Sequence, residues 1–171
     1  FEQKYHDLEV EKLWKKVWQM ACRLDDIPEI GDYILYRVAN IEYIVVRTGE
    51  NEVKAHRNAC MHRGRKLVDT PPGAKNGGGK ARKSFVCGFH GWTYGLDGKC
   101  KFIPHKDDWQ GSLTSENTSL GPVKAETWGG WVWINMDPDA GPLREYLEPI
   151  ATRLDPFEFD KMRYRFRFWG I

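Results

Sequence analysis

Two short segments of the sequence combine thiols with imidazoles. The stretch "CMHRG" contains Cys60 and His62, and the stretch "CGFHGW" contains Cys87 and His90. Glycines flank both pairs, which lets the backbone turn sharply and approach a bound group closely. Thiolate and imidazole ligands suit zinc or an iron–sulfur cluster. These four side chains are therefore the candidate metal ligands, and also the candidate cofactor-binding residues.

The spacing between Cys60 and His62 helps to distinguish a zinc site from an iron–sulfur cluster. Structural zinc sites usually separate paired ligands by about two to four residues, whereas one residue separates Cys60 from His62. In a Rieske [2Fe–2S] cluster, two cysteines bind one iron and two histidines bind the other. A short tether suits such a binuclear centre, because the two ligands of one loop go to different irons. We favour the cluster; a zinc site and a coincidental grouping remain alternatives.

The elements that must position these ligands are predicted to be mainly β. Short strands are expected at "YILYRVA", "EYIVVRT", "EVKAHRNA", "SFVC", "WTYGLDGKCKFI" and "GPVKAETWGGWVWINM". An amphipathic helix is predicted from His6 to about Cys22, where apolar residues recur at spacings of two to four. Residues 71–84, "PPGAKNGGGKARKS", predict a surface loop without a packed element, because little in this segment can be buried.

Two further patterns occupy the C-terminal part of the sequence. Residues 138–154 predict a connecting helix that starts at Pro142. The stretch "KMRYRFRF" then alternates aromatic or apolar residues with arginines, the period expected of a half-buried strand. Period two sends the arginines and the aromatic rings to opposite faces, which disfavours a nucleic-acid surface.

Composition limits the class of protein. The 171 residues fit one compact domain with an appended element, and 26 basic against 24 acidic residues name no polyanionic partner. No apolar run approaches the roughly 18 residues that span a bilayer, and the first residues lack a secretory pattern. We therefore expect a cytoplasmic protein with no membrane or nucleic-acid partner, whose four cysteines serve metal chemistry rather than a disulfide framework.

The sequence resembles the large (α) subunits of Rieske non-haem iron aromatic ring-hydroxylating oxygenases. The resemblance runs through "LWKKVWQMACRLDDIPEIGDYI", "NACMHRGRKL", "FVCGFHGWTYGLDGKC", the following "IPH" and "WGGWVWINMDPDAGPLREYL". It implies an antiparallel β-sandwich that holds a Rieske [2Fe–2S] cluster. By the same resemblance, Cys60 and Cys87 would bind the inner iron, and His62 and His90 the outer, more exposed iron.

The resemblance also implies a division of the chain into three parts. Residues 1–30 would form the N-terminal helix and lead-in, residues 31–137 the Rieske domain, and residues 138–171 a linker helix and the first strand of an α+β catalytic domain. In the family that domain holds a mononuclear iron through two histidines and one carboxylate. This chain has no histidine after His105, so we expect no catalytic residue within it.

The implied function is electron transfer within an oxygenase. Electrons would come from a reductase or ferredoxin and pass to a mononuclear non-haem Fe(II), which hydroxylates an aromatic or related ring substrate with O2. Neighbouring subunits of a trimer-type oligomer are the other expected partners. A free-standing Rieske ferredoxin, an electron carrier, is the alternative. The basic residues of the loop at 71–84 are candidates for docking an acidic donor, although a solvated loop without a partner is an equal alternative.

Three residues beside the ligands predict the redox potential. Arg65, Phe89 and Trp92 stand where respiratory Rieske proteins, by resemblance, carry extra cysteines and a serine that hydrogen-bonds a cluster sulfur. Fewer such hydrogen bonds stabilise the reduced cluster less, which predicts a low potential. Trp92 directly follows the second pair of ligands and is predicted to shield the cluster from water.

Overall fold

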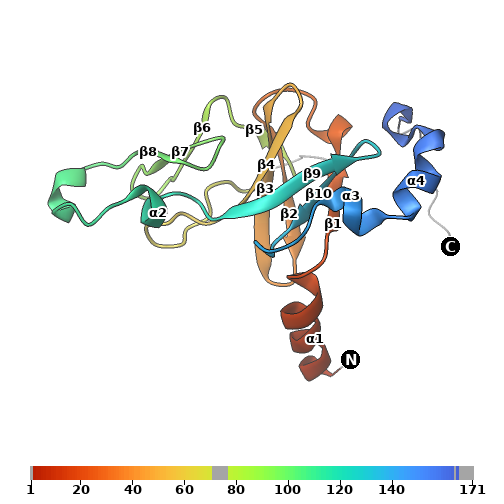
Figure 1. Ribbon diagram of the computed structural model, residues 1–171. Helices are drawn as coiled ribbons and strands as arrows, with labels where there is room; N and C mark the ends of the chain where they lie inside the picture. Colours follow the sequence, from red (N-terminus) through yellow and green to blue (C-terminus); the bar gives the residue numbers. More distant parts are fainter. Residues whose placement is uncertain (1, 71–76, 164, 166–171) are drawn as a thin grey trace.

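The computed structural model describes residues 2–70, 77–163 and 165, and most of its regular structure is β (Figure 1). The strands are β1 (Gln19–Arg23), β2 (Asp32–Val38), β3 (Ile41–Gly49), β4 (Glu52–Arg57), β5 (Gly79–Lys80), β6 (Ser84–Val86), β7 (Thr93–Gly95), β8 (Cys100–Phe102), β9 (Pro122–Trp128) and β10 (Trp131–Asn135). The helices are α1 (Gln3–Glu9), η1 (Val10–Trp14), η2 (Leu24–Asp26), η3 (Lys106–Trp109), α2 (Ser115–Thr118), α3 (Leu143–Leu147), α4 (Ile150–Leu154), η4 (Asp155–Phe157) and η5 (Phe159–Lys161). The predicted fold class, mainly β with an N-terminal helix, is confirmed.

The strands form two antiparallel sheets. A seven-stranded sheet has the order β1-β10-β9-β4-β3-β2-β5, and a three-stranded sheet has the order β6-β7-β8. The candidate ligands lie outside the strands, between β4 and β5 and between β6 and β7. Figure 1 shows the three-stranded sheet extending to one side of the seven-stranded sheet. The short sheet therefore presents the second pair of ligands, while the long sheet supports the first.

Strand β3 separates two hydrophobic cores. Its residues Ile44 and Val46 face one core, and its residues Tyr43 and Val45 face the other, as alternation along a strand requires. We call the first the ligand core; its buried members are Tyr33, Ile44, Val46, Cys60, Leu67, Ala81, Phe85, Cys87, Trp92, Tyr94 and Leu120. We call the second the base core; its buried members are Cys22, Ile27, Ile34, Tyr43, Val45, Val53, Ala55, Val132 and Ile134.

The N-terminal helix is shorter than predicted. Helical structure runs through α1 and η1 and ends at Trp14, and residues Gln19–Arg23 form strand β1 instead. β1 pairs antiparallel with β10, and Trp18 and Cys22 are buried there. Apolar spacings of two to four residues fit both a helix and a strand near the point of transition. Pairing with β10 decides between them, because only the tertiary structure supplies a partner strand.

The segment at 71–84 also differs from the prediction of a loop without packed structure. Gly79 and Lys80 form β5, which pairs with β2 at the edge of the seven-stranded sheet, and Ala81 is buried. A side chain at Gly79 would meet the Tyr33 ring, since an added Cβ would lie 2.6 Å from its hydroxyl oxygen. Glycine therefore permits a close approach to the sheet that a loop composition alone does not indicate.

The single helix predicted over residues 138–154 is two short helices, α3 and α4. Pro149 stands between them; it has no N–H group to donate to a helical hydrogen bond, so the helix cannot continue through it. Of the predicted strand "KMRYRFRF", Lys161 lies in η5, and Met162 and Arg163 are not in a strand. Arg165 is not in a strand either, and the other half of the predicted strand, residues 164 and 166–168, lies outside the described residues.

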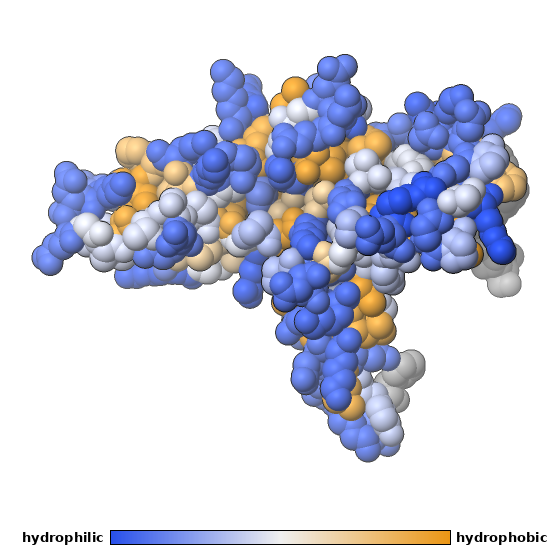
Figure 2. All heavy atoms as spheres, in the orientation of Figure 1, coloured by the Kyte–Doolittle hydropathy of each residue, from blue (hydrophilic) through white to orange (hydrophobic). Residues whose placement is uncertain are grey.

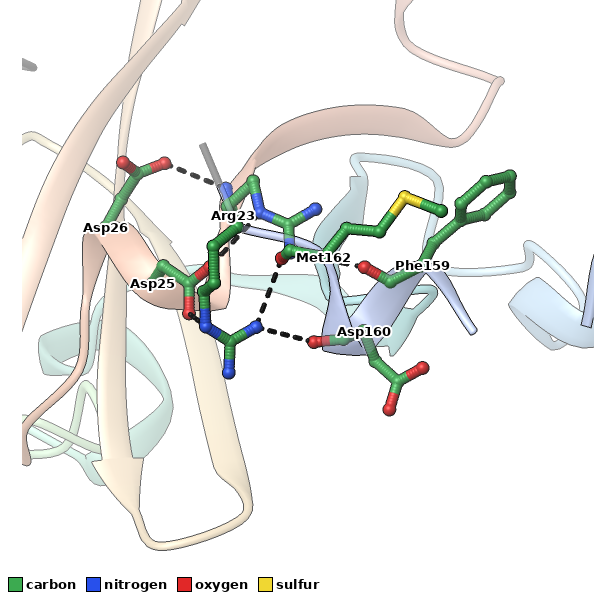
Figure 3. A network of polar contacts seen from close by, with 7 residues as sticks. Arg23, Asp25, Asp26, Phe159, Asp160 and Met162 are labelled. Carbon is green, nitrogen blue, oxygen red and sulfur yellow. Dashed lines mark hydrogen bonds and ion pairs between the residues drawn. The ribbon is translucent and has the colours of Figure 1, made fainter. Parts of the chain in front are cut away.

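A network of polar contacts joins the first strand to the C-terminal segment (Figure 3). The Arg23 guanidinium donates hydrogen bonds to the carbonyl oxygens of Phe159 and Met162, at 3.3 and 2.8 Å, and lies 3.3 Å from the Asp25 carboxylate. Asp25 also lies 3.6 Å from Arg163. Residues distant in sequence are thus held together at the edge of the long sheet, away from the candidate ligands.

The surface is mostly hydrophilic, with apolar side chains showing over the body and along part of α1 (Figure 2). The exposed apolar residues of the N-terminal helical segment are Tyr5, Leu8 and Leu13. Within the described ranges, no helix has both the length and the apolar character needed to cross a membrane.

Candidate metal centre

The first ligand loop, residues 60–65, is closed by its own backbone. The Cys60 N–H donates to the Arg65 carbonyl, and the Gly64 N–H donates to the Cys60 carbonyl, both at 2.8 Å. Gly64 has a φ of +72°, a conformation that glycine adopts without strain. The loop thereby turns tightly around the Cys60 side chain and projects His62 from its apex.

The second ligand loop, residues 87–92, is closed in the same way. The Cys87 N–H donates to the Trp92 carbonyl at 2.8 Å, and the Gly91 N–H donates to the Cys87 carbonyl at 3.0 Å. Gly91 has a φ of +73°, nearly that of its counterpart in the first loop. Two loops of different sequence therefore present a cysteine at the same place in the same turn.

The structure brings all four sequence-predicted residues together, as two pairs. Cys60 and Cys87 are each only 3% exposed and lie in the same ligand core, where burial, helped by the neighbouring Cys87, raises the pKa of the Cys60 thiol. The ring centroids of His62 and His90 are 4.7 Å apart. His62 is half-buried and His90 is exposed. Thiols thus lie on the inner side of the site and imidazoles on its outer side.

The protonation states suit metal binding. Burial raises the pKa of the Cys60 thiol, so a thiolate there needs the positive charge of a metal to form. Burial, and then the nearby His90 and Arg63, lower the pKa of His62, which favours the neutral imidazole that binds metals. Two buried thiols beside two imidazoles are the donor set of a Rieske cluster.

The candidate ligands are arranged as two pairs. In the part of the chain that the structure describes, no group of three or more His, Cys, Asp or Glu side chains is placed to hold one metal ion. Two separate pairs of ligands instead match a binuclear cluster with two ligands on each iron.

Tyr94, in β7, was missed by sequence reasoning. It is fully buried, its hydroxyl oxygen lies 3.2 Å from the Cys60 sulfur, and it accepts a hydrogen bond from the Met61 N–H at 3.0 Å. Burial and the neighbouring Cys60 raise the pKa of Tyr94, so the hydroxyl keeps its proton and can donate it to the sulfur. A signal was present, because Trp92 and Tyr94 are two residues apart at the start of a strand and share a face.

Asn58 fixes the base of the first ligand loop. It is 4% exposed, and its side-chain amide donates to Glu42 at 2.8 Å and to the Val68 carbonyl at 2.7 Å. Its side-chain oxygen accepts from the N–H groups of Leu67 and Val68. Glu42 in turn pairs with Lys66 at 3.1 Å. No spacing in the sequence marks Asn58, since its partners come from β3 and from the chain beyond the loop.

Trp92 lies where the sequence predicted a shield for the cluster. It is 4% exposed and stacks on the His62 ring, with centroids 5.2 Å apart and planes at 6°. Docking of a donor by the basic residues near 71–84 stays a prediction, and two of them, Arg82 and Lys83, are exposed. Lys80 pairs with Glu29 and, at 3.5 Å, with Asp32, so its charge is balanced. Lys75 lies outside the described residues.

Comparison with known proteins gives the site its context. The family model described as "Rieske [2Fe-2S] domain" matches residues 17–120, more than half of the chain. The carnitine monooxygenase oxygenase subunit of Acinetobacter pittii is 31% identical over 147 residues, which are 86% of this chain and 38% of that protein. The large oxygenase component of the naphthalene 1,2-dioxygenase system of Pseudomonas putida is 31% identical over 150 residues, 86% of this chain and 32% of that protein.

Solved structures agree with these relatives. A naphthalene 1,2-dioxygenase mutant bound to phenanthrene superposes with a TM-score of 0.77 and 30% identity, over 91% of this chain and 34% of that one. A quaternary ammonium Rieske monooxygenase in complex with L-carnitine gives 0.76 and 31%, over 88% of this chain and 40% of that one.

The chain thus spans between about a third and two fifths of the length of these relatives and solved chains. All of them are oxygenase components or oxygenases by their names. A Rieske domain implies a [2Fe–2S] cluster. This chain therefore belongs to the Rieske [2Fe–2S] domain family and corresponds to the N-terminal part of Rieske oxygenase α subunits.

Proposed function

We propose that this chain is the electron-transfer domain of a Rieske oxygenase, which passes electrons from a reductase or ferredoxin to a mononuclear non-haem iron. The observation that carries the proposal is that two equivalently closed loops place two buried thiols in one core and two imidazole rings in contact. That arrangement matches the ligand set of one Rieske cluster. Membership of the family supports the same cofactor.

The proposed ligands are Cys60 and Cys87 on the inner iron, and His62 and His90 on the outer iron. The bound cluster supplies a one-electron carrier. The protein holds the two thiols in a buried site and keeps the imidazoles near the surface, where a redox partner can approach. The Tyr94 hydroxyl can donate a hydrogen bond to the Cys60 sulfur. This bond partly replaces the hydrogen bonds to sulfur that respiratory Rieske proteins have and that the sequence predicts to be absent here.

The names of the relatives cover a wider range of substrates than aromatic rings. Among the relatives, some are named for naphthalene or 2,4-dinitrotoluene and others for carnitine or choline. All are similar to this chain at 31 to 35% identity, so the similarity does not choose between aromatic rings and quaternary amines. O2-dependent hydroxylation, a trimer-type assembly and a cytoplasmic location remain part of the proposal.

A free-standing Rieske ferredoxin is the second candidate. It would need only a Rieske domain such as residues 17–120. In this chain α3 and α4 follow that range, and Met162 beyond them is hydrogen-bonded to Arg23. Oxygenase structures superpose over 88 to 91% of the chain, which is more than residues 17–120 alone supply. We therefore favour the oxygenase.

Two measurements test the proposal. Iron and acid-labile sulfide in the purified chain are expected at two of each per chain, and EPR of the reduced protein should show coupling to two imidazole nitrogens. Zinc without sulfide, or coupling to a single nitrogen, would reject the ligand assignment. The coding sequence beyond residue 171 separates the two candidate functions: a downstream set of two histidines and a carboxylate indicates an oxygenase, and a stop codon indicates a carrier.

A further inference from the structure

One segment that contains none of the predicted metal-binding residues lies against the metal centre, and we call it the arm. It runs from Ile103 to Leu113, between β8 and α2, and contains the short helix η3. Left-handed residues stand at both ends of η3, His105 with a φ of +52° and Gln110 with a φ of +50°. Figure 1 shows this arm at the far end of the molecule, beyond the three-stranded sheet. Such costly backbone conformations persist only where the surrounding structure holds them.

The arm places one large side chain, that of Trp109, at the metal centre. Trp109, the last residue of η3, lies edge-on to the His62 ring, with centroids 5.7 Å apart and planes at 79°. It also lies edge-on to Trp92, at 5.9 Å. Because Trp92 stacks flat on the same imidazole, His62 sits in a corner formed by two indoles.

The other outer imidazole has no such cover. His90 is exposed, and its aromatic neighbours among the described residues are Phe89, at 3.8 Å, and His62. Phe89 is itself 55% exposed, whereas Trp109 is 37% exposed. The two histidines therefore differ in their access to water, and both Trp92 and the arm contribute to the difference.

Hydrogen bonds hold the arm in this position. The Ser112 N–H and hydroxyl both donate to the Trp109 carbonyl, at 3.0 and 2.7 Å. The Asn117 amide donates to the Ser112 carbonyl at 2.9 Å, and Asn117 also closes a capping box with Thr114 at the start of α2. These hydrogen bonds connect the backbone at Trp109 to the following helix, α2, and so fix the position of the Trp109 indole.

We propose that Trp109 is a positioning residue, which fixes the His62 imidazole against Trp92 and keeps water from that side of the cluster. The inference rests on the proposed function. A reduced cluster carries one more negative charge than the oxidised cluster, and water stabilises the more highly charged state. Excluding water therefore lowers the reduction potential, and the apolar surroundings of a metal site are known to act in this way.

The test compares three forms of the loaded full chain: wild type, Trp109→Ala and Trp109→Phe. Pulsed EPR of the reduced cluster in D2O reports nearby exchangeable deuterons, and potentiometry reports the midpoint. Trp109→Ala is expected to deepen the deuterium modulation and to favour reduction by up to about tenfold, which is about 59 mV for a one-electron couple. Trp109→Phe keeps an apolar ring and should stay near wild type in both measurements.

A matched control is Trp128→Ala. Trp128 is also an indole that is only partly covered, but it ends β9 and lies edge-on to Phe159 at the other end of the molecule. It should change neither measurement. Wild-type modulation and midpoint in a fully loaded Trp109→Ala variant would overturn the proposal, as would a Trp109→Phe variant that shifts as far as Trp109→Ala.

If the Trp109→Ala variant loses iron, Trp109→Leu takes its place in the test, because leucine keeps apolar volume without a ring. That variant should show deeper modulation than Trp109→Phe, and equal modulation in the two would reject the positioning role. A wild-type chain without a [2Fe–2S] signal would refute the proposed function instead, so the two failures are distinguishable.

Discussion

The ligand core and the base core share strand β3 but are built differently. The base core lies among long strands, such as the nine residues of β3 and the seven of β2, and most of its members are aliphatic. The ligand core is bounded by β6, β7 and β8, of three residues each, and contains both cysteines. We therefore expect backbone ladders and apolar burial to hold the base core, and the ligand core to depend on the cluster as a cross-link between its two loops.

The largest expected effect is loss of the cluster in a Cys87→Ser variant. A missing thiolate removes one of two ligands of the inner iron, so iron and sulfide should be absent. Hydrogen exchange should then become fast in β6 to β8 and stay slow in β3 and β10, because only the ligand core depends on the metal.

The matched control for this prediction is Cys22→Ser. Cys22 is also a buried thiol, and burial raises its pKa to about 12, but it belongs to the base core. It should keep a full complement of iron. Uniform loss of protection in both cores of Cys87→Ser would show that they unfold as one unit.

The base core is tested by Ile134→Ala. Ile134 is fully buried in β10, and truncating a buried isoleucine to alanine costs about 2–5 kcal/mol of unfolding free energy. The EPR signal of the folded, loaded protein should be unchanged. Ile150→Ala, at a side chain 53% exposed, should change stability by less than about 0.5 kcal/mol. A changed cluster signal in Ile134→Ala would mean that β3 transmits packing changes between the cores.

The hydroxyl of Tyr94 is tested by Tyr94→Phe. A donor to the Cys60 sulfur favours the more negative, reduced cluster, so its removal should lower the midpoint. A difference of about 1 kcal/mol for one hydrogen bond corresponds to roughly 40–50 mV for one electron. Tyr43→Phe, which removes a buried phenol from the base core, should leave the midpoint unchanged. An unchanged midpoint in Tyr94→Phe would contradict the hydrogen bond.

The last effect, which depends on pH, concerns His56, a residue that links the two regions. His56 lies in β4, and its Nε2 is 2.9 Å from the Leu96 carbonyl beyond β7. Its Nδ1 is buried without a hydrogen-bond partner among the described residues. Burial lowers the pKa of His56, while the Leu96 carbonyl and Asp97 oppose this and Lys54 adds to it.

The sign of the pH effect follows from that lowered pKa. As the pH falls, the unfolded chain binds a proton at this histidine near its usual pKa of about 6.5, before the folded chain does. Stability is therefore fully present above about pH 6.5 and declines below it, by at most about 1.4 kcal/mol per pH unit. Denaturant unfolding at pH 7.5 and 5.5 should show a smaller decline in His56→Gln than in wild type. His6→Gln, on exposed α1, should decline as wild type does.

Local sequence by itself determined the candidate ligands, the turns of their loops and most of the strands. The four ligand-type residues, the glycines that close their loops and the alternating strands were predicted because each depends on residue type and on neighbours a few positions away. The tertiary structure decided the rest. It made residues 19–23 a strand by pairing them with β10, placed Tyr94 against a thiol, and brought Trp109 over His62. Those outcomes depend on contacts between residues far apart in the chain, which no local periodicity records.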